Sequence, residues 1–226
     1  MQSITAGALG QQTRLKRFLQ NFSPVHYDRG QIILFQGEVP RDAYILKSGI
    51  VKVYNIDDVG REQLIFFKST YETFPFTWVM GQVPTTQYFY ETVTECEIYK
   101  FPKERYLEFL ANNKDLLFET LMSRARQDYI KTVRLNAVLH PKATDKLLHI
   151  LHCLCISNGV TNKGHVTLNL PLSQQDFANM TGLTRETVSL EFTKLKKAKV
   201  LSTKQSRYYQ VNYPLFKKYL NDQFLM

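Results

Sequence analysis

Cysteine is scarce in this chain of 226 residues, which has only Cys96, Cys153 and Cys155. So small and odd a number does not provide a disulfide framework, and it is typical of a reducing cytoplasm. Long apolar runs are also missing, because no segment approaches the roughly 20 apolar residues that cross a bilayer. The first residues, MQSITAGALGQQTRLKRFLQ, lack the basic start and apolar centre of a signal peptide. We therefore expect a cytoplasmic protein without a membrane partner.

Histidine is rare in the first half of the chain, where His26 is the only one before residue 140. A metal-dependent barrel enzyme would need clustered histidine and acidic ligands on its strands. The sequence therefore predicts no catalytic residue and no metal ligand in this region, and the chain is not expected to be an enzyme.

The charge of the chain is strongly positive, at +9 with a pI near 9.4. Residues 185–226 contain nine Lys and Arg against Glu186, Glu191 and Asp222, which is a net charge of +6 for this segment. A basic C-terminal part favours an anionic partner such as nucleic acid.

Residues 25–101 have the composition of short strands. Aromatic and β-branched residues alternate with glycines at 30, 37, 49 and 60, which are suited to turns. The stretches 50–54 and 97–101 show the pattern most clearly. Many short strands separated by turns predict a barrel or a double-sheet jelly roll.

A long helix is predicted from about Lys114 to His140, where neither proline nor glycine occurs. Seven residues recur along it with alternating spacings of four and three: Phe118, Met122, Ala125, Tyr129, Thr132, Asn136 and Leu139. This heptad spacing predicts a contact between two copies of the helix. The alternative is that the helix packs the same stripe on its own barrel.

After Pro141 the sequence predicts a second helix over 144–156. NGVTNKGH is expected to be a turn-rich connector, and VTLNLPL a short strand.

Residues 173–196 predict two short helices joined by a tight turn. Ser173 and Asp176 can cap the first helix, Gly182 suits the turn, and Thr184 can cap the second helix. Val188, Phe192 and Leu195 then form a buried stripe.

The opposite side of the second helix carries Arg185, Glu186 and Ser189 near its N-terminus. Arg can bind guanine through O6 and N7, and Glu can accept a bond from the amine of cytosine. The lysines at 194, 196, 197 and 199 can neutralise phosphates, and VLSTKQSRYYQVNY predicts a hairpin beside them. The predicted DNA-binding residues are Ser173, Gln174, Thr184, Arg185, Glu186, Thr187, Ser189, Leu190, Lys194, Lys204 and Arg207.

The order of barrel, long helix and winged helix resembles the CRP/FNR superfamily of bacterial transcription regulators. GQIILFQGEVPRDAYILKSGIVKVY and LPLSQQDFANMTGLTRETVS carry the resemblance. It implies an α+β chain with three parts: a double-sheet jelly-roll sensor domain with an N-terminal helix over 1–112, a dimerisation helix over 113–140 and a winged helix-turn-helix domain over 141–226. It also implies a homodimer on palindromic double-stranded DNA that contacts RNA polymerase.

The chain departs from the motifs that bind effectors in this superfamily. Aligned without gaps, the carboxylate that holds the ribose of a cyclic nucleotide is replaced by Phe76, and the arginine that holds its phosphate by Thr86. An anion without a cation is costly to bury, so cyclic AMP is not expected to be the signal. An iron-sulfur cluster needs four cysteine ligands, and the chain has three. A haem needs an accessible axial histidine, and His26 is interpreted as an ordinary strand residue, so neither cofactor is expected.

Aromatic residues are concentrated between Phe74 and Tyr90. They can line a site for a small apolar or aromatic effector, or they can fill the space of the former nucleotide pocket. The predicted effector residues are Phe74, Phe76, Trp78, Thr86, Gln87, Tyr88 and Tyr129.

A further departure lies in the predicted reading helix, where many relatives have an arginine at the position of Leu190. The expected half-site therefore has one strict G and one strict C position beside a relaxed one, with Leu190 free to meet a thymine methyl.

Two other functions stay open. His149, His152, Cys153 and Cys155 lie close together on one predicted helix, which suggests either a metal- or thiol-responsive regulator or ordinary core packing. The winged helix can also be a protein-interaction module that has lost DNA binding.

Overall fold

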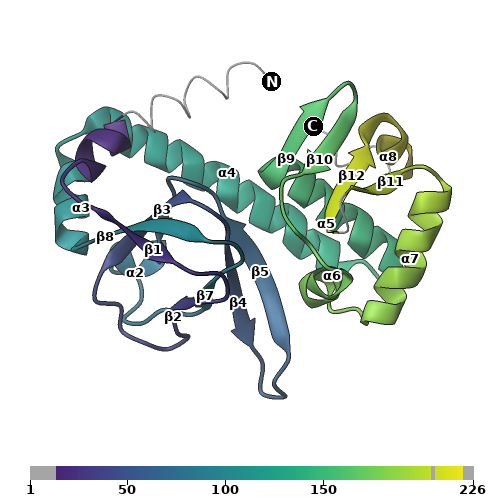
Figure 1. Cartoon of the computed structure of the whole chain (residues 1–226), viewed down its shortest axis with the longest axis horizontal. Helices are drawn as coiled ribbons and strands as arrows, with labels where there is room; N and C mark the ends of the chain where they lie inside the picture. The colour runs from purple at the N-terminus through teal and green to yellow at the C-terminus, as the bar shows by residue number, and fades with distance from the viewer. Residues whose placement is uncertain (1–13, 205–206, 221–226) are drawn as a thin grey trace. The chain divides into compact units, whose positions relative to one another are not determined.

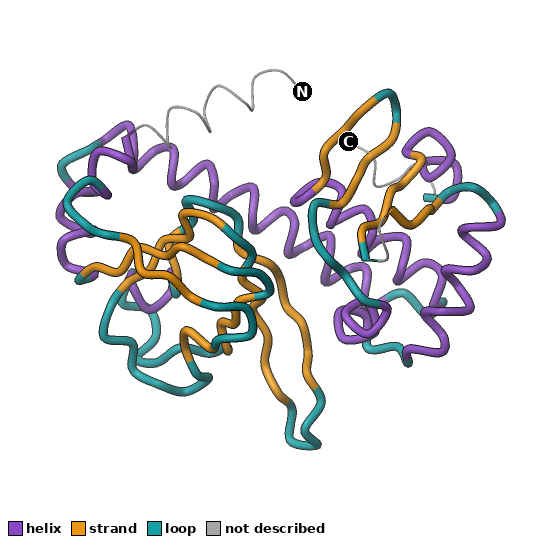
Figure 2. Tube along the Cα trace, in the orientation of Figure 1, coloured by secondary structure: helices purple, strands orange, loops and turns teal. Residues whose placement is uncertain are grey.

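The computed structural model describes residues 14–204 and 207–220, and the chain divides into two compact units, Met1–Ala125 and Arg126–Met226. Within the described residues, unit 1 contains eight strands in two sheets, and unit 2 combines helices with one four-stranded sheet (Figures 1 and 2). The boundary lies within α4 (Lys114–Leu139), so the predicted helix 113–140 supplies residues to both units.

Unit 1 is built on two antiparallel sheets with the strand orders β1-β8-β3-β6 and β2-β7-β4-β5. The strands are β1 (Pro24–Tyr27), β2 (Ile32–Leu34), β3 (Ala43–Ser48), β4 (Val51–Ile56), β5 (Glu62–Lys68), β6 (Thr73–Phe74), β7 (Phe89–Thr92) and β8 (Cys96–Phe101). The hairpin of β4 and β5 extends beyond the other strands in Figure 1. Two facing antiparallel sheets confirm the predicted jelly-roll class.

The glycine predicted to form a turn at position 49 lies between β3 and β4, where neighbouring atoms leave no room for a side chain. Gly49 has φ +95°, and a Cβ atom there would clash with the carbonyl oxygen of Glu95 and with Sγ of Cys96. Only glycine satisfies both conditions.

The core between the two sheets is formed by side chains from both of them. Its buried members are Leu34, Tyr44, Leu46, Val51, Val53, Phe74, Tyr90, Cys96 and Ile98. The Phe74 ring stacks between Tyr44, at 5.4 Å, and Tyr90, at 5.2 Å. Aromatic rings therefore fill the centre of the jelly roll.

A second apolar cluster lies where helices cover the outer side of β3 and β8. Residues 14–19, α2 (Phe76–Val79), α3 (Lys103–Ala111) and the start of α4 contribute to it. The ring centroid of Phe18 lies 5.1 Å from that of Phe101 and 4.9 Å from that of Phe109. The first turns of α4 are thereby fixed to the jelly roll.

All seven residues of the predicted heptad stripe of α4, from Phe118 to Leu139, are exposed. The alternative that this stripe packs on the chain's own barrel is therefore wrong. The opposite side of the helix is buried instead, at Leu116 and Thr120 in unit 1 and at Val133 and Ala137 in unit 2.

Unit 2 contains α5 (Ala143–Asn158), β9 (Gly159–Asn162), β10 (His165–Leu168), α6 (Gln174–Thr181), α7 (Arg185–Lys197), β11 (Leu201–Lys204), β12 (Tyr208–Asn212) and α8 (Tyr213–Tyr219). Its antiparallel sheet has the order β11-β12-β10-β9. The NGVTNKGH segment, predicted as a turn-rich connector, includes strand β9, so that prediction is wrong over Gly159–Asn162. Pairing with β10 satisfies its backbone groups, a long-range effect that its turn-forming composition does not reveal.

Two arginines attach the second half of α4 to the other helices of unit 2. Arg126 donates a hydrogen bond to the carbonyl oxygen of Ile156 at 3.2 Å, and Arg134 donates one to that of Met180 at 3.5 Å. Burial lowers the pKa of Arg134 to about 10. The C-terminal end of α6 is thus joined to the same helix that carries the heptad stripe.

Candidate nucleic-acid interface

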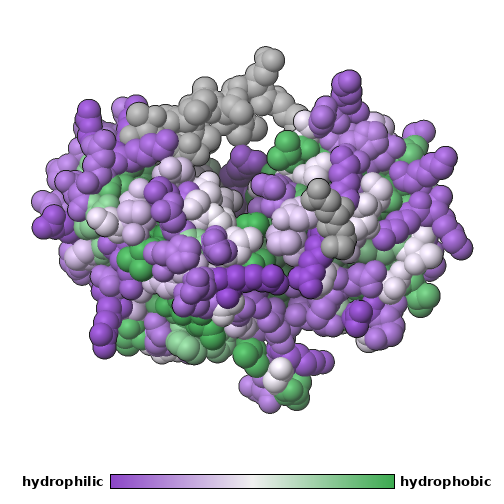
Figure 3. All heavy atoms as spheres, in the orientation of Figure 1, coloured by the Kyte–Doolittle hydropathy of each residue, from purple (hydrophilic) through white to green (hydrophobic). Residues whose placement is uncertain are grey.

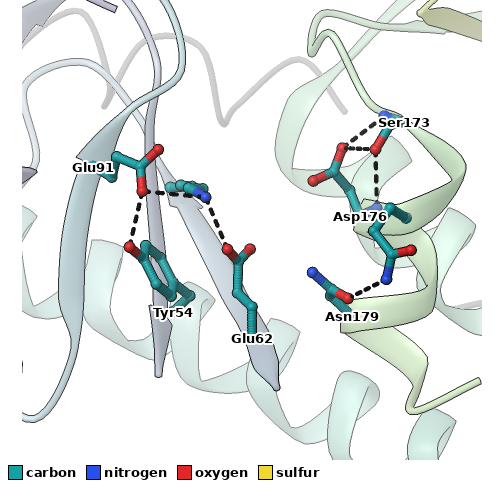
Figure 4. A network of polar contacts seen from close by, with 8 residues as sticks. Tyr54, Glu62, Glu91, Ser173, Asp176 and Asn179 are labelled. Atoms are coloured by element: carbon teal, nitrogen blue, oxygen red, sulfur yellow. Dashed lines mark hydrogen bonds and ion pairs between the residues drawn. The ribbon is translucent and has the colours of Figure 1, made fainter. Parts of the chain in front are cut away.

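The N-terminus of α6 is closed by the predicted capping pair. Ser173 Oγ accepts a bond from the backbone N–H of Asp176 at 3.2 Å, and Asp176 Oδ2 accepts one from the backbone N–H of Ser173 at 2.6 Å (Figure 4). The two bonds satisfy amide groups that the helix itself leaves free. Because Asp176 also accepts from the Ser173 hydroxyl at 2.6 Å, this hydroxyl is engaged within the helix end.

The turn between α6 and α7 has the geometry that the sequence predicts. Gly182 has φ +70° and its N–H donates to the carbonyl oxygen of Ala178 at 2.9 Å. Thr184 then caps α7, because its Oγ1 accepts from the N–H of Thr187 at 3.2 Å. The Thr187 hydroxyl lies 3.0 Å from the Thr184 hydroxyl, so this predicted DNA-binding residue also supports the cap.

An aromatic triad holds α7 in place. Phe177 of α6, Phe192 of α7 and Tyr209 of β12 pack edge to face, with ring centroids 4.8 to 5.3 Å apart. Val188 and Leu195 complete the buried side of α7, as predicted. The outer side of α7 is therefore presented at a fixed angle to α6 and β12.

The outer side of α7 begins with two charged residues. Arg185 and Glu186 are exposed in the first turn, Ser189 is half-buried, and Leu190 is exposed. The structure thus places these four predicted residues on one helix end. In Figure 3 the visible face of unit 2 is mostly hydrophilic, with scattered hydrophobic side chains.

The lysines at the C-terminal end of α7 are not equivalent, which the sequence did not indicate. Lys194, Lys196 and Lys197 are all exposed. Lys194 also forms a 2.6 Å ion pair with Glu191. Glu191 is 7% exposed and also accepts a 2.6 Å bond from the hydroxyl of Thr144. Burial raises the pKa of the Glu191 carboxyl, but the bonds from Lys194 and Thr144 together hold it below its ordinary value. Sequence reasoning missed this site, although a Glu followed by Lys three residues later is a recognisable helix pair.

The predicted hairpin after α7 is present as β11 and β12, with Lys204 opposite Tyr208. Residues 205 and 206 lie outside the described part of the chain. Arg207 is exposed, and its carbonyl oxygen accepts a bond from the N–H of Leu172 at 2.9 Å. That bond connects the hairpin to the segment just before Gln174, the half-buried first residue of α6.

The predicted effector residues do not lie together. Phe74 belongs to the core between the sheets, whereas Trp78 belongs to the cluster under the helices. Thr86 is buried and its hydroxyl donates to the carbonyl oxygen of Tyr88 at 2.9 Å. Gln87 and Tyr129 lie at the surface. These positions favour rings that fill the barrel over rings that surround a ligand.

A cation lies beside one of these aromatic residues. The guanidinium of Arg124, on α4, lies 3.5 Å from the centroid of the Phe76 ring and donates to the carbonyl oxygen of Thr73 at 3.4 Å. Sequence reasoning did not identify Arg124, because it comes from the helix and not from the barrel strands.

On the outer side of the second sheet, a polar network links β4, β5 and β7. Nζ of Lys52 lies 3.0 Å from a carboxylate oxygen of Glu62 and 3.3 Å from one of Glu91 (Figure 4). The hydroxyl of Tyr54 donates a 2.8 Å hydrogen bond to the carboxylate of Glu91. Each charged group of the network has an opposite charge as neighbour, so its members stabilise the sheet.

The histidines and cysteines of α5 are part of the core. Cys153 and Cys155 are buried, and burial raises the pKa of their thiols to about 11 and about 12. A reactive thiol requires the opposite shift. Within residues 14–204 and 207–220, no three His, Cys, Asp or Glu side chains are grouped to hold a metal ion. These observations oppose the metal- and thiol-responsive alternative.

None of the helices in the part of the chain that the structure describes is long and apolar enough to cross a membrane.

Two family models match the chain in the same order as the two units. The cyclic nucleotide-binding domain matches residues 24–113, and the Crp-like helix-turn-helix domain matches residues 145–214. The nitrogen fixation regulation protein FixK of Rhizobium meliloti is 32% identical over 185 residues, which cover 80% of this chain and 79% of that protein. The HTH-type transcriptional regulator ArcR of Staphylococcus haemolyticus is 26% identical over 183 residues, which cover 77% of this chain and 76% of that protein.

Solved structures share the fold. FixK2 from Bradyrhizobium japonicum has a TM-score of 0.71 at 17% identity, covering 87% of this chain and 96% of that one. A cyclic nucleotide-binding domain containing protein from Listeria monocytogenes EGD-e has a TM-score of 0.75 at 15% identity, covering 90% and 98%.

Proposed function

Because this chain belongs to the CRP/FNR family of DNA-binding transcription regulators, we propose that it binds a palindromic DNA site as a homodimer and places α7 of each protomer in the major groove. The observation that carries the proposal is the division of α7 into two sides. The aromatic triad holds its inner side, and Arg185 and Glu186 are exposed at its N-terminal end. This is the end of a recognition helix that contacts base edges.

The base-reading chemistry assigned to α7 follows from its side chains. Arg185 donates two bonds to O6 and N7 of a guanine, and Glu186 accepts a bond from N4 of a cytosine. Ser189 is small and half-buried, so it lets the helix backbone approach the groove. Each good base contact is worth about 1–3 kcal/mol of discrimination.

The phosphate contacts are assigned to cations around α7. Lys196, Lys197 and Lys199 follow the reading residues, and Lys204 and Arg207 lie on the hairpin of β11 and β12. At the N-terminus of α6, a phosphate contact is also assigned to the side chain of Gln174, which is half-buried. These contacts orient the protein on DNA without reading its sequence.

The dimer contact is assigned to the heptad stripe of α4. Apolar stripes with a heptad spacing are stable when a second helix covers them, and polar members such as Thr132 and Asn136 set the register of the pair. Two reading helices related by a twofold axis require half-sites separated by about 10 base pairs or a multiple of this. We expect the dimer to act in the cytoplasm together with RNA polymerase, by binding and not by catalysis.

We further propose that DNA binding does not require cyclic AMP. Phe76 and Thr86 replace the expected ribose and phosphate ligands, and the stacked rings of Tyr44, Phe74 and Tyr90 occupy the space between the sheets. Affinity for the DNA site should therefore be unchanged when cyclic AMP is added at millimolar concentration.

The decisive experiment is the selection of bound sites from random duplex DNA, with and without metabolites extracted from cells. A palindrome with one strict G and one strict C in each half-site supports the proposal. Absence of binding to random duplex at low salt would contradict it, because exposed lysines give salt-sensitive, non-specific affinity. That result would favour the interaction-module alternative.

A further inference from the structure

An apolar side chain occupies the outer side of the reading helix. Leu190 is 65% exposed, although it belongs to a helix whose other apolar residues, Val188, Phe192 and Leu195, are buried. Single exposed leucines are ordinary on a protein surface. The position of this one within α7 distinguishes it.

Helix geometry places Leu190 in the same row as Glu186. Residues four apart lie one above the other on a helix. The buried side of α7, centred on Val188 and Leu195, faces away from this row. A groove that receives Glu186 therefore also receives Leu190, about one turn further along the helix.

The polar side chains that follow Leu190 are already engaged. The hydroxyl of Thr193 donates to the carbonyl oxygen of Ser189 at 2.9 Å, and Lys194 forms a 2.6 Å ion pair with Glu191. Leu190 is thus the exposed apolar group on this turn of α7.

We infer that Leu190 is a specificity-determining residue that contacts the C5 methyl group of a thymine, beside the base pair read by Glu186. The inference rests on the proposed insertion of α7 into the major groove. The thymine methyl is the one apolar group among the base edges exposed there. Every other base edge would lose hydrogen bonds to water against a leucine and gain none in return. The leucine therefore favours thymine modestly at a position that is otherwise relaxed.

The test uses the duplex obtained by site selection. Each thymine of the half-site is replaced in turn by deoxyuridine, which lacks only the C5 methyl group. The affinity of the wild-type protein should fall about fourfold for each half-site at one thymine position, as expected for burial of one methyl group. The Leu190→Ala variant should bind the thymine duplex more weakly and should not distinguish thymine from uracil at that position.

Two results would overturn the inference. One is a wild-type protein that binds every deoxyuridine duplex as tightly as the thymine duplex. The other is a Leu190→Ala variant that keeps the full preference for thymine. Val160→Ala is the matched control, since Val160 is 61% exposed on β9, and its preference should equal that of the wild type.

The same measurements separate this inference from the proposed function. If a palindrome with strict G and C positions is selected but no thymine is sensitive, only the role of Leu190 is wrong. If no specific site is selected at all, both proposals are wrong.

Discussion

The hydroxyl of Thr144, in the first turn of α5, donates a 2.6 Å hydrogen bond to the carboxylate of Glu191 on α7. Glu191 is almost completely buried and is also paired with Lys194. A buried charge is stable only when its partners are in place. The start of α5 and the middle of α7 are therefore joined by one carboxylate, which restricts the angle between these two helices.

Replacement of Glu191 by glutamine should reduce the stability of unit 2. Gln keeps an acceptor for Thr144 but loses the attraction to Lys194, so we expect a loss of about 1–3 kcal/mol in the free energy of unfolding at pH 7. Urea denaturation followed by circular dichroism measures it. Lys194→Gln should reduce the free energy of unfolding by a comparable amount, because it leaves the same carboxylate buried without its cation.

The pH dependence of this contribution has a definite sign. Because the pKa of the folded Glu191 is lowered, its stabilising effect is complete above the unfolded pKa and is lost as the pH falls through the folded pKa. The difference in stability between wild type and Glu191→Gln should therefore shrink on acidification below about pH 4.3. A difference that stays constant down to about pH 3 would contradict this account.

The histidines of α5 should make unit 2 sensitive to mild acid. Burial is the main cause that lowers the pKa of both His149 and His152. His140, whose ring centroid lies 4.5 Å from that of His149, lowers the pKa of His149 further, whereas Asp145 raises it. The unfolded chain therefore binds more protons, and stability should fall as the pH drops below the ordinary histidine pKa of about 6.5.

The check is urea denaturation between about pH 7.5 and pH 5, the range in which an ordinary histidine titrates. His149→Phe should show a flatter dependence on pH than the wild type.

Two lysines of α7 should differ in their contribution to DNA binding. Lys197 is exposed, and its replacement by glutamine should reduce the salt dependence of binding, with the slope of log K against log[salt] changing by about 0.9 for each phosphate that is no longer neutralised. Lys194→Gln should change the slope less, because Glu191 already compensates the charge of Lys194. Equal slopes for the two variants would show that the ion pair opens on DNA.

A charge in the heptad stripe of α4 should separate the protomers. Met122 lies in the stripe and is exposed, so Met122→Glu should fold normally but sediment as a monomer. Its affinity for the palindrome should fall by about 100-fold or more, since the two half-sites are no longer bound together. Leu117→Glu is the matched control, because Leu117 is exposed on the same helix beside the stripe and not within it. Dimers of Met122→Glu in sedimentation experiments would contradict the assignment.

Local patterns in the sequence were sufficient for the helix-turn-helix. The caps at Ser173 and Thr184, the turn at Gly182 and the stripe of Val188, Phe192 and Leu195 depend on residues within a few positions of one another. The heptad stripe of α4 could be predicted in the same way, since helical geometry alone places its seven residues on one side. The jelly-roll class followed from alternating residues and turn glycines.

Long-range packing set the remaining features. Strand β9 exists because β10 pairs with it, and the predicted effector residues separate because Phe74 and Trp78 lie on opposite sides of one sheet. Unlike the other charged residues of α7, Glu191 accepts a hydrogen bond from Thr144, which lies 47 positions earlier in the sequence. Helical periodicity is a local property, so the order of residues already indicates which side chains lie on the outer side of α7. Which of its charges remain available for DNA follows from the folded chain, because burial and pairing depend on neighbours distant in the sequence.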